Sequence, residues 1–165
     1  MEDENDILDG DVDGLGDESE IAEMKVSPVI KRGKSRLQFA DGALYDGEWK
    51  EEDGVRVREG QGRAIDGSEV FEGEWMDDKL HGDAVATYAS GATYDGEWSN
   101  NMMDGIGKYA WANGAIYEGS WKCNKMHGEG TYTDPDGVQW SGTFKNGLFK
   151  NGKARIDVTA AVESL

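Results

Sequence analysis

Apolar and polar residues alternate along much of this chain, and the apolar positions are mostly aromatic with a glycine between them. In residues 93–98, Tyr94, Gly96 and Trp98 fall on one face of an extended segment, and the polar residues between them fall on the other. A period of two is typical of a β-strand with one buried face. The pattern therefore predicts short strands whose aromatic residues share a side.

The pattern aromatic-x-Gly-x-aromatic is an internal repeat. Its first aromatic residue stands at positions 45, 71, 94, 117 and 140, so that successive units are 26, 23, 23 and 23 residues apart. A second half with small residues at alternating positions follows most units, as in Gly105 and Gly107. Such spacing indicates a repeat architecture, in which each unit is one supersecondary element.

Turn residues recur at fixed places between the halves. Asn100-Asn101 separates the two halves of one unit, and Asn113-Gly114 leads into the next unit. Asparagine and glycine tolerate the positive φ of tight hairpin turns, so each unit is predicted to be a β-hairpin. The glycines inside the strands are expected to make room for rings from the neighbouring strand. The first unit has a longer loop at 53–58, which predicts either a surface insertion or a specific contact.

A single hairpin buries too little surface to be stable, whereas stacked hairpins share a continuous aromatic row. We therefore predict an all-β fold, an elongated twisted single sheet of about five tandem hairpins over residues 33–153. Residues 154–165 are expected to form a C-terminal cap or tail.

The units resemble the MORN repeat, in which Y-x-G-x-W is followed by a turn and then H-G-x-G. Residues 117–121 (YEGSW) and 126–130 (MHGEG) match this pattern, whereas Asp104 and Glu59 stand where histidine is usual. The chain is most similar to small proteins that consist of MORN repeats, among them axonemal and radial-spoke proteins. The resemblance implies a protein-binding scaffold that holds a helix or an extended segment along its aromatic face, in the cytoplasm, within a ciliary axoneme or another cytoskeletal assembly. Other proteins with MORN repeats have been linked to phosphoinositides, and in some the repeats occur beside catalytic domains.

Charge is distributed unevenly. Residues 1–24 contain 11 acidic and no basic residues, residues 25–40 contain five basic and no acidic residues, and residues 41–165 contain 12 basic and 23 acidic residues. We expect residues 1–24 to be a disordered acidic tail and residues 25–40 to be a basic linker that includes the start of the array. The net charge of −17 disfavours nucleic-acid binding and general membrane contact. An alternative function is a peripheral membrane adaptor that binds phosphoinositides through the basic segment 25–36.

The longest apolar runs fall short of the roughly 18 residues of a membrane-spanning helix, and the N-terminus lacks the features of a signal or transit peptide. A single cysteine, Cys123, excludes an intrachain disulfide. These features favour a cytoplasmic protein.

Residues 9–20 (DGDVDGLGDESE) fit the oxygen-ligand spacing of an EF-hand calcium loop. Gly16 occupies the position at which EF-hands use an aliphatic residue, and only eight residues precede the loop, too few for an entering helix. We therefore expect an acidic tail rather than a metal site.

No set of residues predicts catalysis, a cofactor or a metal. His81 and His127 occupy the same repeat position and are expected to be structural, and Cys123 is predicted at a turn without a nearby base. Large aromatic side chains are common interface anchors. The predicted partner-binding residues are those of the middle units: Tyr94, Trp98, Tyr109, Trp111, Tyr117, Trp121 and Tyr132.

Overall fold

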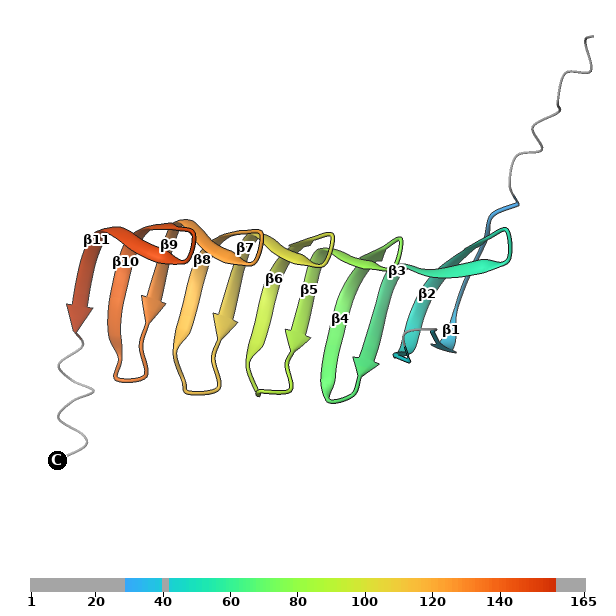
Figure 1. Ribbon diagram of the computed structural model, residues 1–165, viewed down its shortest axis with the longest axis horizontal. Coiled ribbons are helices and arrows are strands. Elements are labelled where there is room, and N and C mark those ends of the chain that lie inside the picture. The colour runs from blue at the N-terminus through green and yellow to red at the C-terminus, as the bar shows by residue number, and fades with distance from the viewer. Residues whose placement is uncertain (1–28, 40–41, 157–165) are drawn as a thin grey trace, which may run out of the picture.

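The computed structural model describes residues 29–39 and 42–156, which form one open antiparallel sheet of 11 strands. The strands follow one another in chain order, so each pairs only with its neighbours in sequence. They stand side by side along the long axis of the molecule (Figure 1). Their bounds are β1 Lys31–Gln38, β2 Leu44–Glu52, β3 Val55–Asp66, β4 Glu69–Met76, β5 Lys79–Thr87, β6 Thr93–Ser99, β7 Met102–Ala110, β8 Ile116–Lys122, β9 Lys125–Thr133, β10 Val138–Lys145 and β11 Leu148–Ile156. The predicted all-β single sheet is confirmed, and no helix occurs among the described residues.

Five hairpins, β2–β3 to β10–β11, make up the array, and their turns lie where the sequence places them. Both residues of each tight turn have positive φ, for example 50° and 65° at Asn100 and Asn101 and 47° and 64° at Cys123 and Asn124. These values define turns whose twist matches that of the flanking strands. Between hairpins, the chain turns at a glycine with positive φ, as at Gly114, whose N–H donates to the carbonyl of Trp111.

Each of the first four hairpins contains a bulge at the same place. In the third hairpin, Gly96 pairs with Gly107 and Trp98 pairs with Met103, so one residue of β6 lies opposite three residues of β7. The extra residues include Gly105, whose φ of +115° is unfavourable for other residues. Bulges bend a strand and increase its twist, which curves the sheet around its aromatic face.

The core is a row of tyrosine and tryptophan rings on this face. Tyr94 is fully buried and contacts Trp98 and the next unit's Trp121, with ring centroids 5.1 and 5.4 Å apart. A side chain at Gly107 would overlap the ring of Tyr94, so the expectation that glycine makes room for a neighbouring ring is confirmed. The Tyr94 hydroxyl donates to the carbonyl of Glu97, and the Trp98 indole N–H donates to the carbonyl of Ala84.

The first hairpin is longer than the others because β2 and β3 continue to a turn at Asp53-Gly54. The extra residues therefore extend the sheet instead of forming a loop. Glu51 on this extension forms ion pairs with Lys31 and Arg56, so the extension also contacts β1. The predicted acidic tail, the loop 9–20 and residues 157–165 lie outside the described part of the chain.

Candidate functional site: an aromatic groove over the first hairpins

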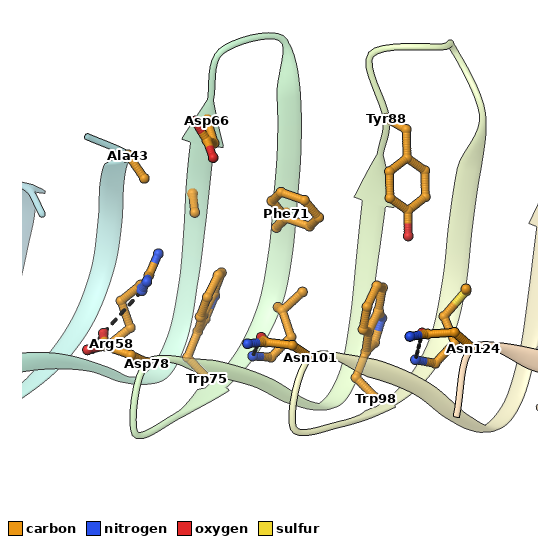
Figure 2. Close-up of a pocket in the computed structure, with 13 residues that line it drawn as sticks. Ala43, Arg58, Asp66, Phe71, Trp75, Asp78, Tyr88, Trp98, Asn101 and Asn124 are labelled. Carbon is orange, nitrogen blue, oxygen red and sulfur yellow. Dashed lines mark hydrogen bonds and ion pairs between the residues drawn. The ribbon is translucent and has the colours of Figure 1, made fainter. Parts of the chain in front are cut away.

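A groove with a volume of about 410 Å³ opens on the aromatic face over the N-terminal half of the array. Figure 2 shows Phe71 and Tyr88 on one of its walls, and Trp75 and Trp98 on the other. Its lining combines aromatic, aliphatic and polar side chains: Ala43, Arg58, Ala64, Asp66, Phe71, Trp75, Asp78, Leu80, Tyr88, Trp98, Asn101, Met103 and Asn124.

Two rows of rings run along the array. The inner row is buried and consists of Tyr45, Trp75, Tyr94, Trp98, Tyr117, Trp121 and Phe144. The outer row is half-buried and continuous, with successive ring centroids 4.6 to 6.3 Å apart, and consists of Phe71, Tyr88, Tyr109, Trp111, Tyr132 and Trp140. Because the outer row keeps part of its surface accessible, it can bury further apolar area against a second molecule.

The groove is open at Ala64, where alanine replaces tyrosine, whereas Ala86 in the second unit is fully buried and does not line it. Ala64 and Ala86 lie opposite the first aromatic residue of the first two units, and Tyr109 and Tyr132 lie at the same position in the third and fourth. Tyr109 fills this space by packing on Trp111 and Trp121, with centroids 4.6 and 5.9 Å apart. The shorter Ala64 leaves the equivalent space empty and lines the groove.

The second unit differs from its neighbours at two linked positions. Its first aromatic residue is Phe71 instead of tyrosine, and Ala84 occupies the place of Gly107. Ala84 is buried and takes up space that glycine would leave for a tyrosine ring. Phe71 is only half-buried and forms part of the groove wall.

An ion pair lies at the N-terminal end of the groove. Arg58 occupies the position that Leu80 and Met103 hold in the next two units. Its guanidinium lies over Phe39 and Trp75, 5.1 and 4.7 Å from the ring centroids, and its Nε is 3.2 Å from Oδ1 of Asp78.

From the second hairpin on, the second turn residue of each hairpin donates its N–H to the hairpin before it. Asn101 Oδ1 accepts a hydrogen bond from the N–H of Leu80, and the Asn101 N–H donates to the Leu80 carbonyl. Asn124 binds Met103 in the same way, and the Asp78 carboxylate accepts from the N–H of Arg58. These contacts fix how consecutive hairpins stack, and Figure 2 shows Asn101 and Asn124 at the edge of the groove.

Burial also affects the titration of the tyrosines. Desolvation raises the pKa of Tyr45 and of Tyr117 to about 12. The pKa of Tyr88 is raised to about 12 by desolvation and, to a lesser extent, by Tyr109 and Glu69. The phenol groups of Tyr45, Tyr88 and Tyr117 are therefore neutral across the physiological range.

The seven predicted partner-binding residues fall into two groups. Tyr94, Trp98, Tyr117 and Trp121 belong to the buried inner row, and Trp98 is the one member of the seven that lines the groove. Tyr109, Trp111 and Tyr132 belong to the half-buried outer row. Partner binding by these residues stays a prediction.

Sequence reasoning missed most of the groove. Arg58, Asp66, Phe71, Trp75 and Tyr88 were not predicted as site residues, although all line the groove. The sequence did contain a signal. Ala64 and Ala86 align with Tyr109 and Tyr132, and the absence of a ring from a repeated row predicts a gap in the packing there.

Other candidate chemistry lies elsewhere. His81 and His127 do not line the groove, and Cys123 is exposed at its turn with its N–H donating to Asp104. Over residues 29–39 and 42–156, no three histidine, cysteine or acidic side chains come together as metal ligands. In the same part of the chain, no helix is long and apolar enough to cross a membrane.

Three of the five basic residues of segment 25–36 form ion pairs within the array. Lys31 pairs with Glu51, Arg32 with Glu59, and Arg36 with Asp46. A lipid phosphate would therefore compete with these carboxylates for exposed basic side chains, and the membrane-adaptor alternative stays a prediction.

Comparisons with known proteins identify the repeats. The MORN repeat family matches three consecutive segments, 71–93, 94–116 and 117–139, each running from the first strand of one hairpin to the next hairpin. No curated protein matches the chain significantly. MORN repeats generally bind proteins or membranes, and they are typically binding modules without enzymatic activity. The matched segments together span residues 71–139, which are thus similar to three tandem MORN repeats.

Proposed function

We propose that this protein is a non-enzymatic scaffold that holds a segment of a partner protein, a helix or an extended strand, in the groove over its first three hairpins. The observation that supports the proposal is the local opening of the aromatic row, where Ala64 replaces the tyrosine of later units. A groove that combines aromatic and aliphatic surface with several polar side chains can give a peptide segment both apolar burial and orientation.

Affinity capture from ciliated cells tests this function when wild type is compared with Ala64→Tyr. The new ring takes the register position that Tyr109 holds in the third hairpin, with Trp75 in the place of Trp121 and Asp66 in the place of Trp111, so the variant is expected to fill the groove. Ala112→Tyr, which adds the same ring at an exposed turn residue outside the groove, is the matched control. We expect partners to be lost with Ala64→Tyr and retained with Ala112→Tyr. Partners retained by both variants would overturn the groove as the binding site.

The cellular setting is part of the proposal. We propose that the protein works in a ciliary axoneme or another cytoskeletal assembly, and the support for this is its resemblance to axonemal MORN proteins. Detergent extraction of cilia that contain the tagged protein provides the test. Retention of wild type but not of Ala64→Tyr in the axonemal pellet supports the proposal. Full release of the wild-type protein into the detergent fraction contradicts it.

A further inference from the structure

The groove already holds one cation of its own. Arg58 lies between the rings of Phe39 and Trp75 and is paired with Asp78, and its side chain is only 11% exposed. A guanidinium between aromatic faces and beside a carboxylate is stabilised by both cation–π attraction and a charged hydrogen bond. The N-terminal end of the groove thus shows how this surface accommodates a positive charge.

A second place in the same groove has matching chemistry. Phe71 and Tyr88 form an edge-to-face pair with centroids 6.3 Å apart, and Asp66 lines the groove with them (Figure 2). Asp66 is exposed and forms no ion pair with any residue of the described part of the chain. The rings and the carboxylate are present here, as around Arg58, but residues 29–39 and 42–156 supply no cation to this place.

The register of the sheet adds a second acidic group. Asp66 lies directly opposite Glu69 across the β3–β4 turn. Like charges at directly paired positions repel each other and destabilise a hairpin. The other polar groups of the groove are already engaged, since Asn101 and Asn124 accept hydrogen bonds from backbone N–H groups. A cation from outside the chain would relieve the repulsion between Asp66 and Glu69.

We propose that the groove selects a partner segment with a lysine or arginine next to a bulky apolar residue. The basic side chain contacts Asp66 and the faces of Phe71 and Tyr88, and the apolar residue fills the space between Trp75 and Trp98. The excess of acidic residues in 41–165, 23 against 12 basic, attracts such a segment over longer distances. This inference rests on the proposed function, because it specifies the occupant of the same groove.

Selection from a random peptide library displayed on phage tests the inference without a known partner. The full chain and its Ala64→Tyr variant are used as separate targets. We expect wild type to select peptides that Ala64→Tyr does not bind, and we expect these peptides to contain a lysine or arginine adjacent to a large apolar residue. If no selected peptide depends on the open groove, the proposed function fails. If groove-dependent peptides have no enrichment of basic residues, only the present inference fails.

The selected peptides then serve as probes for Asp66. Loss of a hydrogen bond to a charged group predicts a roughly tenfold weaker Kd for Asp66→Asn, measured by fluorescence anisotropy at low salt. Asp95→Asn is the matched control, because Asp95 is an exposed strand residue outside the groove, and its substitution removes the same charge. Equal effects of the two variants would show a nonspecific charge effect and would overturn the role of Asp66.

Discussion

The first two hairpins and the next two share one backbone plan but fill their aromatic faces differently. In the third and fourth hairpins, Tyr109 and Tyr132 complete a closed double row of rings over Gly107 and Gly130. In the first and second, alanine replaces these tyrosines, and the second hairpin has Phe71 and Ala84 at the positions where the third has Tyr94 and Gly107. The C-terminal half therefore satisfies its packing internally, whereas the N-terminal half keeps a groove.

The difference shows how a repeat protein can open a groove at one place along its face without altering its fold. Turns, bulges and hairpin stacking are the same in both halves, because turn residues and backbone contacts determine them. Side-chain volume at one repeated position then determines whether the face is closed or open. Exchanging residues between the halves is the direct way to test this view.

The largest expected effect on stability comes from replacing Gly107 of the third hairpin with alanine, the residue that the second hairpin has at this position as Ala84. In Gly107→Ala the added methyl group overlaps the buried ring of Tyr94, and we expect a loss of about 3 kcal/mol in the free energy of unfolding. Adding Tyr94→Phe should recover part of this loss, because it removes the hydroxyl closest to the new methyl group and reproduces the Phe71–Ala84 pair. Urea denaturation of the two single variants and the double variant provides the measurement. Additive losses would contradict the proposed link between the two positions.

Alkaline pH tests the buried tyrosines of both halves. The phenol of Tyr45 or Tyr117 has a pKa near 10 in the unfolded chain and about 12 in the folded one, so the unfolded state loses its proton first. Stability should be constant below pH 10 and should fall between pH 10 and 12, on the order of 2 kcal/mol for each such tyrosine. Tyr117→Phe should reduce the decrease. If Tyr117→Phe leaves the pH dependence of stability unchanged, ionisation of Tyr117 does not contribute to the decrease.

A smaller loss of stability is expected when the Arg58–Asp78 ion pair at the groove end is replaced by the uncharged residues found at these positions in later hairpins. Arg58→Met leaves the carboxylate of Asp78 without its ion pair to Arg58, and we expect a loss of about 1.5 kcal/mol. Arg58→Met with Asp78→Asn reproduces the Met103–Asn124 contact of the third and fourth hairpins and should be close to wild type in thermal denaturation. A double variant as unstable as the single one would show that the two ends of the groove are not interchangeable.

The smallest effect is expected at the turn contacts. Asn101→Ala removes the acceptor for the N–H of Leu80 and should lower stability by about 1 kcal/mol. The last turn has Gly147 at this position and keeps only the backbone hydrogen bond to Met126. Gly147→Asn should therefore have the opposite sign and raise the midpoint of thermal unfolding. A decrease with Gly147→Asn would indicate that the last hairpin stacks differently.

Much of the fold could be predicted from the sequence, because turn chemistry and a period of two act locally. Asn100-Asn101 and Asn113-Gly114 fix a hairpin wherever they occur between alternating segments. The bulge at Gly105 could not be predicted in the same way, since it depends on the register between two strands. Register also determines that Tyr94 and Tyr117 are buried, although as large aromatic residues they resembled interface anchors. The groove depends on which residues the register brings to the aromatic face. The role of Ala64 and Arg58 as lining residues could therefore be recognised only in the structure.

Strand order has a consequence for how the chain assembles. Since every strand pairs only with its sequence neighbours, all hydrogen-bonded contacts close over short stretches of chain. Proteins of this kind have low contact order, and folding can begin at any favourable unit and spread to adjacent ones. The closed third and fourth hairpins, with their complete double row of rings, are the natural starting point. The groove-bearing hairpins would then form last, on a template that is already complete.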